Sequence, residues 1–229
     1  MISILPVEGV PEVRPGDDLA ALIATACNAR PDTSLVDDDV VVIAHKAVSK
    51  AEGRFVDGDD RLAAALSEST RVLRRAGDMV ISETRHGFVC ANSGVDASNV
   101  EGKRLVLLPI DPDLSARRLR ARLEHLTGTR LGVIVSDTFG RAWRMGQTNV
   151  AIGVAGVAPF VDYRGTLDAE GRELSATEIC VADEIAGAAE LVMGKTLRVC
   201  AAVVRGTPVR FGRGSARQIV RPPDEDLFR

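Results

Sequence analysis

The sequence lacks several features that mark large classes of protein. Its 29 basic and 32 acidic side chains leave a formal net charge of -3, so nothing draws the whole chain to nucleic acid or to a membrane surface. No apolar run approaches the roughly 20 residues that a membrane helix needs, and the first residues carry no charged leader with a cleavage site. We therefore expect a globular, cytoplasmic protein that binds neither nucleic acid nor membrane.

Several common catalytic motifs are missing as well. The four cysteines lie far apart, without CxxC spacing or a matching histidine pair, which argues against zinc and indicates reduced thiols in the core. Only three histidines are present, and none of them can be placed in a Ser-His-Asp or Cys-His arrangement. A GxGxxG dinucleotide motif is also absent. Nucleophilic catalysis through one of these arrangements is therefore not indicated.

A third motif is present only in part. Gly194-Lys195-Thr196 is similar to the end of a phosphate-binding P-loop, but Ala189 stands where that loop needs its first glycine. The expected helix also precedes the motif, whereas a P-loop is followed by its helix. From the residues alone, this segment is better interpreted as a helix C-cap with a lysine favoured by the helix dipole.

What the sequence does contain is an alternation of helical and strand patterns, with 45% hydrophobic residues in 229, enough for a sizeable core. Apolar periodicity predicts helices over residues 19–30, 61–75, 113–127 and 175–193. Asp113 is expected to cap the third helix, and Ser175 with Glu178 to form a capping box for the fourth. Strands are predicted at residues 2–5, 40–44, 78–81, 87–90, 105–108, 131–135, 150–154, 159–161 and 198–204.

The paired short strands near residues 79–90 and 150–161 break a strict βαβ rhythm. We therefore predict an α/β or α+β fold with a mixed sheet. The chain is expected to form a single unit over residues 1–229 with two interleaved lobes. Residues 221–229 are interpreted as a tail or the start of a linker.

Two polar segments could carry chemistry. The apolar strand at residues 131–135 leads into Asp137 and Thr138, with Arg141 and Arg144 beyond, and Asp96 lies in a run of small polar residues. Ligands sit at the carboxyl ends of strands in α/β proteins, so these oxygens could hold a hard cation and a phosphate while the arginines face anions. A lone Ser-Asp-Thr tripeptide, however, more often marks a turn with a side-chain cap.

Other cations are scattered along the chain at His45, Lys50, Arg85 and Lys195. Carboxylate and hydroxyl oxygens are ligands for Mg²⁺ or Mn²⁺, and these ions act together with lysines and arginines on phosphates. The residues therefore indicate a nucleotide-phosphate site.

At these residues the sequence resembles the coenzyme F420-0:L-glutamate ligase family, which adds glutamate to the deazaflavin coenzyme F420. The resemblance runs nearly end to end. It is carried by five ordered blocks, namely LPVEG (5–9), HKAVSKAEGR (45–54), GFVCANSGVD with Ser98 and Asn99 (87–99), SDTFGR (136–141) and MGK (193–195). The resemblance implies GTP as phosphate donor, divalent metals, and an α+β fold of two lobes that forms an intertwined homodimer.

The resemblance also implies roles for residues of this chain. Asp96 and Asp137 would bind one Mg²⁺ or Mn²⁺ and Thr138 a second, with Met193 near that second ion through its backbone; K⁺ is a further candidate ion. Arg141 joins Asp96, Asp137 and Thr138 as a catalytic residue. The implied GTP contacts are Val10, Pro11, Glu12, Val13, His45, Lys50, Asn99, Leu191, Val192, Met193, Gly194, Lys195, Thr196, Leu197 and Arg198.

The expected function is an amide-forming ligase. GTP would phosphorylate the terminal carboxylate of F420-0, and the amino group of L-glutamate would attack the acyl phosphate, releasing GDP and phosphate. Two rivals use the same residues: a metal- and GTP-dependent phosphotransferase or phosphatase, and a nucleotide-binding module without catalysis.

Overall fold

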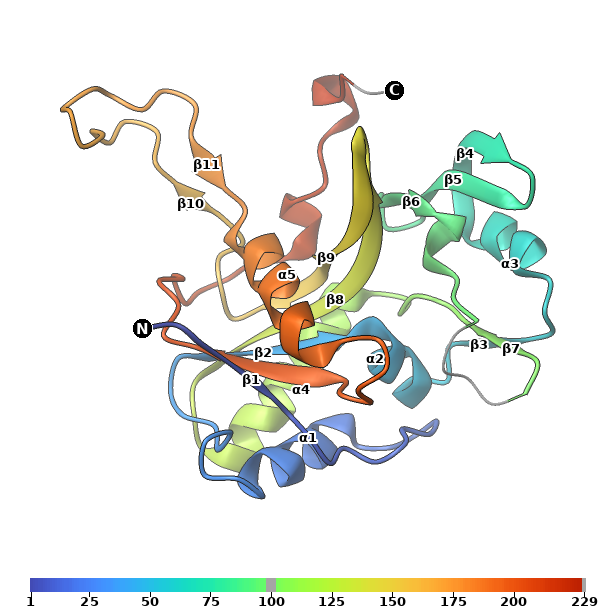
Figure 1. The fold of residues 1–229 in the computed structure, drawn as a ribbon, viewed down its shortest axis with the longest axis horizontal. Coiled ribbons are helices and arrows are strands. Elements are labelled where there is room, and N and C mark those ends of the chain that lie inside the picture. The colour runs from blue at the N-terminus through green and yellow to red at the C-terminus, as the bar shows by residue number, and fades with distance from the viewer. Residues whose placement is uncertain (98–101, 228–229) are drawn as a thin grey trace.

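The computed structural model describes residues 1–97 and 102–227. Its body is a five-stranded mixed sheet in the order β1-β12-β2-β8-β9, visible across the lower half of Figure 1. Strands β2 and β8 run parallel, and the other neighbours are antiparallel. The strands are β1 (Ser3–Pro6), β2 (Asp39–Ala44), β8 (Leu131–Arg141), β9 (Arg144–Ala155) and β12 (Ala201–Arg205).

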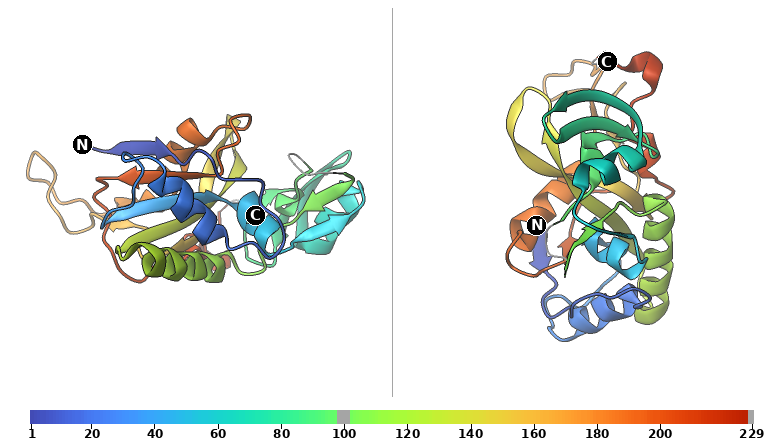
Figure 2. Two further views of the ribbon diagram at one scale, coloured as in Figure 1. Left: turned by 90° about the horizontal axis from the view of Figure 1, so that it is seen from below. Right: turned by 90° about the vertical axis from the view of Figure 1, so that its right-hand side faces the viewer.

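The sheet is covered on both faces, which explains its continuous apolar strands. Helices α4 (Pro112–Thr127) and α5 (Val181–Met193) lie on opposite sides of it (Figure 2), and α1 (Leu19–Asn28) packs beside α4. All four residues of Val40–Ile43 are fully buried, as expected for a central strand between two layers of helices. The main hydrophobic core therefore surrounds β2 and β8.

A smaller unit is inserted between β2 and α4. It has its own hydrophobic cluster, which includes Ala65, Val80, Val95 and Leu105, and it lies to the right of the body in Figure 1. Its elements are α3 (Arg61–Glu68), the sheet β4 (Ser69–Ala76), β5 (Met79–Thr84) and β6 (Val89–Ala91), and the pair β3 (Phe55–Asp57) with β7 (Arg104–Val106). Helix α2 (His45–Ala51) joins it to β2.

The remaining elements are short. Strands β10 (Val161–Asp162) and β11 (Glu178–Ile179) pair at the base of a projecting arm, and three 3-10 turns, η1 (Asn92–Gly94), η2 (Ala216–Gln218) and η3 (Pro223–Glu225), complete the order. The predicted mixed α+β character is confirmed. The predicted interleaving of lobes and the intertwined dimer stay predictions.

Two expectations about helix ends were wrong. The helix expected over residues 61–75 ends at Glu68, because the following residues pair with β5 as strand β4. Asp111, not Asp113, caps α4 by accepting a hydrogen bond from the backbone of Leu114 at 2.9 Å. Asp113 is instead buried and accepts from the backbone N–H groups of Val154 and Ala216, at 2.8 and 2.7 Å, tying α4 to β9 and to η2.

The fourth helix also begins later than expected. Glu178 and Ile179 pair with β10 as strand β11, so α5 starts only at Val181. Strand β8 is longer than predicted, because it continues to Arg141 and forms a hairpin with β9 that projects above the sheet (Figure 1). The predicted helix ends at Gly128 and Gly194 are confirmed, each with positive φ.

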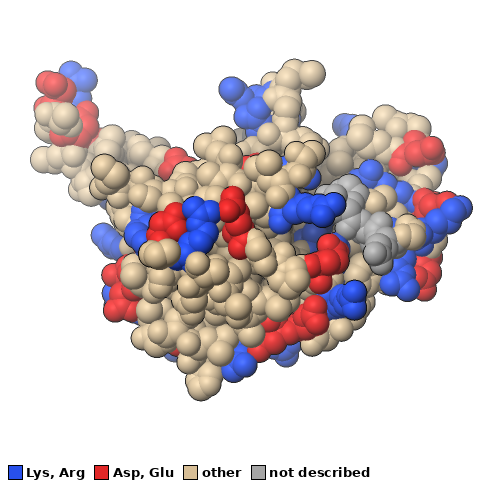
Figure 3. All heavy atoms as spheres, turned by 60° about the horizontal axis from the view of Figure 1, so that its bottom comes forward, with Lys and Arg blue, Asp and Glu red and all other residues tan. Residues whose placement is uncertain are grey.

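In the view of Figure 3, acidic and basic side chains are interspersed over an otherwise uncharged surface. No helix within the described ranges combines the length and apolarity needed to cross a bilayer.

Candidate active site

The site begins where parallel strands β2 and β8 lie side by side. Ala44, the last residue of β2, is opposite Ser136, so the next residues along each strand are His45 and Asp137. His45 Nε2 lies 3.1 Å from Asp137 Oδ1, with the histidine 3% and the aspartate 12% exposed. Asp137 was expected at the end of its strand. It lies inside β8 because pairing with β9 extends that strand, yet it does occupy the carboxyl edge of β2.

Helix α2 makes three contacts with predicted site residues. Its first residue, His45, contacts Asp137, and the next, Lys46, forms an ion pair with Asp96 at 2.7 Å. One turn later Lys50 Nζ pairs with the carboxylate of Glu12. Three segments that are remote in sequence are therefore drawn to one short helix, because α2 follows directly from the central strand.

A second polar group lies around Thr138, whose side chain projects from the opposite face of β8 to that of Asp137. Thr138 Oγ1 donates to Asn149 Oδ1 at 2.6 Å, and Lys195 Nζ donates to Thr138 Oγ1 at 2.6 Å. Glu190 completes the group, since it accepts from Asn149 Nδ2 at 3.0 Å and pairs with Lys195 at 3.0 Å. Loop residue Lys195 is thus brought to β8 by the end of α5.

Asn149 and Glu190 were missed from the sequence. Asn149 is 4% exposed and lies directly across the hairpin from Thr138. Only the register of the hairpin reveals that pairing, and no local pattern of residues indicated that β8 would extend so far. Glu190 falls on the helix expected over residues 175–193, and its position on the last turn would have been the available signal.

The implied nucleotide contacts fall mainly into two segments beside this edge. The segment Val10–Val13 reaches α2 through Glu12, and the end of α5 continues into the loop that carries Lys195. Within that loop Gly194 has φ of +55°, and Leu197 packs against it. Leu191, which is 81% exposed, and Val192 lie in the last turn of α5, and Thr196 and Arg198 lie in the loop. Asn99 lies outside the described residues.

Two predicted residues are placed differently from the others. Met193 is 2% exposed and its side chain belongs to the main hydrophobic core, so a contact with an ion would have to come from its backbone carbonyl. Arg141 lies at the tip of the β8–β9 hairpin, where its guanidinium donates to the backbone oxygen of Met145 at 2.6 Å. The structure does not bring Arg141 together with the residues around α2.

The cysteines near the site stay protonated. Burial raises the pKa of the Cys90 thiol to about 12, and the carboxylate of Asp137 adds to the shift. Burial likewise raises the pKa of Cys200 to about 11. Thiolate is the nucleophilic form of cysteine, so neither side chain is activated for covalent catalysis.

The oxygen atoms at this edge are of the kind that a hard cation prefers. No cluster of three or more His, Cys, Asp or Glu side chains suited to a metal occurs in residues 1–97 and 102–227. Mg²⁺ is usually bound by one or two carboxylates together with substrate phosphates and water, so a full protein cage is not required. Asp137 and Asp96, each now beside a basic side chain, fit that type of site.

Comparisons with known proteins identify the family of the chain. A model of the F420-0:gamma-glutamyl ligase family matches residues 9–65 and 59–206. The chain belongs to this family. The coenzyme F420:L-glutamate ligase of Methanothermobacter thermautotrophicus is 43% identical over 250 residues, covering 100% of this chain and 99% of that relative. The enzymes of the same name from Methanopyrus kandleri and Archaeoglobus fulgidus are 43% and 41% identical, each covering 100% of this chain.

The match includes the elements that form the site. The two matched ranges of this F420-0:gamma-glutamyl ligase family contain α2, Asp96, Asp137 and Lys195. The resemblance seen in the sequence is therefore confirmed at the level of the family. The individual roles of the residues, the metals and GTP remain predictions.

Proposed function

We propose that this chain is a GTP-dependent ligase that joins L-glutamate to coenzyme F420-0 through a γ-glutamyl amide bond. The relatives that cover the whole chain are named coenzyme F420:L-glutamate ligases, which supports glutamate ligation. GTP, and the release of GDP and phosphate, are the finer part of the proposal and rest on the family resemblance.

One observation carries the proposal. Helix α2 places a basic side chain beside Asp137, beside Asp96 and beside Glu12, at the carboxyl edge of two parallel strands, where α/β proteins bind ligands. Such a mixture of carboxylates and cations suits a phosphate that is held partly through a hard ion and partly through lysine. The site therefore favours phosphoryl transfer over the chemistry of a nucleophilic side chain.

The chain's own residues have distinct proposed roles. Asp96, Asp137 and Thr138 would hold Mg²⁺ or Mn²⁺, which when bound supplies charge neutralisation at the phosphates, and K⁺ is a further candidate ion. Lys195 and Lys50 would bind phosphate oxygens. His45 would orient the carboxylate of Asp137, since its Nε2 lies 3.1 Å from Asp137 Oδ1.

The proposed reaction has two displacements. A carboxylate oxygen of F420-0 attacks the γ-phosphorus of GTP, and GDP leaves. The amino group of glutamate then attacks the acyl carbon, loses a proton, and displaces phosphate. Positioning and electrostatic stabilisation account for such a reaction, because phosphoryl transfer needs little covalent participation by the protein.

A single assay separates this proposal from its rivals. Purified protein is incubated with GTP, Mn²⁺, L-glutamate and F420-0, and both the glutamylated product and free phosphate are measured. Glutamylated product with equimolar phosphate supports the ligase. Phosphate without amide indicates a phosphatase or phosphotransferase, and GTP binding without either product indicates a nucleotide-binding module.

We also propose that the chain works as a cytoplasmic homodimer. The support for the dimer is the family resemblance, together with a hairpin tip at which Met145 is 93% exposed, since exposed apolar groups often mark contact surfaces. Sedimentation at micromolar concentration tests it, because a species near the chain mass of 24.4 kDa would contradict the dimer.

A further inference from the structure

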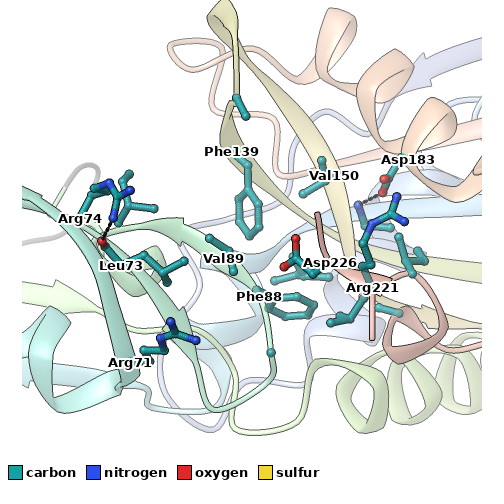
Figure 4. Close-up of a pocket in the computed structure, with 18 of the residues that line it drawn as sticks. Arg71, Leu73, Arg74, Phe88, Val89, Phe139, Val150, Asp183, Arg221 and Asp226 are labelled. Atoms are coloured by element: carbon teal, nitrogen blue, oxygen red, sulfur yellow. Dashed lines mark hydrogen bonds between the residues drawn. The ribbon is translucent and has the colours of Figure 1, made fainter. Parts of the chain in front are cut away.

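A large cavity lies on the face of β8 that carries Asp137. Its volume is about 760 Å³, within the range of sites that enclose small-molecule ligands. It is bounded by the β8–β9 hairpin, by the small sheet β4-β5-β6, and by the C-terminal segment that includes Ile219, Arg221 and Asp226 (Figure 4). None of the site residues predicted from the sequence lines it.

The deep wall of the cavity is aromatic and aliphatic. Phe88 and Phe139 meet edge to face, with ring centroids 6.2 Å apart, and Val89 and Val150 lie beside them in Figure 4. Flat aromatic molecules pack well against such surfaces, since aromatic rings favour offset or edge-to-face contacts with one another. The wall is therefore suited to a planar ring system.

The lining of the cavity includes three arginines together with two carboxylates, Asp183 and Asp226. Arg71 and Arg74 come from edge strand β4 and Arg221 from the C-terminal segment. Arg74 donates to the backbone oxygen of Leu73, and none of the three guanidinium groups forms a salt bridge with a carboxylate within the described parts of the chain. Arginines presented in this way around an apolar cavity suit a ligand with anionic groups.

Strand geometry connects the cavity to the candidate active site. Side chains two residues apart on a strand project from the same face, so Asp137 and Phe139 share one face of β8 while Thr138 projects from the other. Val150, which lines the cavity, is the cross-strand partner of Asp137. The lining therefore includes the cross-strand partner of Asp137 but not Asp137 itself, whereas Thr138 contacts Asn149 and Lys195 on the other face of the strand.

We propose that this cavity binds the acceptor of the reaction, a planar aromatic molecule with anionic groups. This assignment rests on the proposed ligase function. The ring packs on Phe88 and Phe139, the anionic groups contact Arg71, Arg74 and Arg221, and the carboxylate to be activated reaches Asp137. The acceptor carboxylate can attack the γ-phosphorus only if both lie on the same side of the strand, so the nucleotide phosphates must extend past β8 to the side of Asp137.

The first test uses charge. The affinity of purified protein for F420-0, the acceptor of the proposed reaction, is measured by equilibrium dialysis without GTP, for wild type, Arg71→Gln, Arg74→Gln and the double variant. Loss of one charge-assisted contact should weaken acceptor binding about tenfold. Arg75→Gln is the matched control, because Arg75 lies on the same strand, donates to the backbone of Gly77 and does not line the cavity. Its affinity should stay within about twofold of wild type.

The second test uses volume. Val72 lines the cavity and is 42% exposed, whereas Met79 on the neighbouring strand is 48% exposed and lies outside it. Val72→Trp should reduce acceptor binding while leaving GTP affinity unchanged, and Met79→Trp should change neither. Acceptor affinity that is equal in wild type, the arginine variants and Val72→Trp would overturn the assignment.

Two further outcomes separate the possible failures. If Arg71→Gln, Arg74→Gln and Val72→Trp alter the sedimentation coefficient but not acceptor affinity, the cavity is a contact with a second copy and the assignment is wrong. If wild type binds F420-0 in an arginine-dependent way but yields no amide with GTP and glutamate, the proposed reaction fails while the cavity assignment stands. If these variants form amide with an unchanged KM for the acceptor, the proposed reaction stands and the cavity assignment is wrong.

Discussion

His45 Nε2 lies 3.1 Å from Asp137 Oδ1 and joins the residue that follows β2 to its neighbour on β8. The buried Nδ1 atom of His45 has no hydrogen-bond partner in the part of the chain that the structure describes. The histidine contacts one oxygen of Asp137 and leaves the second oxygen available for a ligand.

Asp137→Asn should abolish turnover and leave the fold intact. The amide keeps the shape of the side chain but removes the charge that we expect to hold the metal, and loss of such a charge usually removes orders of magnitude of activity. Activity is measured at saturating Mn²⁺, and folding by circular dichroism and thermal unfolding. Asp162→Asn, in the projecting arm, is the control and should keep wild-type activity. If the Asp137→Asn variant keeps more than about half of wild-type activity, Asp137 is not part of the active site.

Patterns that depend on near neighbours predicted much of the fold. The strand ending in Ala44 was found because its residues are continuously apolar, and the helix end at Gly128 because a glycine follows the apolar stripe; its φ of +72° confirms that end. The helix expected over residues 61–75 failed after Glu68, because pairing with β5 outweighs local helical preference there. Contacts between distant segments decide such cases, and a single sequence does not reveal them.

Some residues of the candidate site could likewise be predicted from the sequence, and others could not. Asp137, Thr138 and Lys195 could be selected from residue type and motif, and the structure brings Lys195 to Thr138. Asn149 could not be selected, because its position depends on the register of an extended hairpin. The cavity beside Asp137 was likewise beyond prediction, since it is formed by three segments that no local pattern relates.

Arg205→Ala should strongly destabilise the fold. Arg205 forms two hydrogen bonds of 2.8 Å with the carboxylate of Asp39, which is 0% exposed. Removing one partner of a buried pair leaves an uncompensated charge, which lowers the free energy of unfolding by about 3 kcal/mol or more. Urea denaturation measures it. Arg130→Ala breaks the exposed pair with Asp38 and should lower the same quantity by less than about 1 kcal/mol. Equal effects of the two substitutions would contradict this account.

His86 should make the fold less stable in mild acid. Burial lowers the pKa of His86 below its ordinary value of 6.5, although Nε2 donates to the backbone oxygens of Pro109 and Ile110. The unfolded chain then binds the proton more readily than the folded chain, so stability that is present above about pH 6.5 is lost as the pH falls. Wild type should lose more unfolding free energy than His86→Gln between about pH 7.5 and pH 5.5. An identical loss in both proteins would show that His86 does not contribute.

The last prediction concerns the proposed acyl phosphate. The cysteines near the site have raised pKa values, about 12 for Cys90 and about 11 for Cys200, so an acyl-enzyme on either thiol is not expected. If the acceptor carboxylate attacks the γ-phosphorus instead, one of its oxygens must leave with phosphate when the glutamate amine displaces it. F420-0 is therefore labelled with ¹⁸O in its terminal carboxylate, and the released phosphate is analysed by mass spectrometry. We expect one labelled oxygen in each phosphate for every amide formed from fully labelled acceptor. Unlabelled phosphate at full amide yield would exclude the acyl-phosphate route while leaving glutamate ligation itself established.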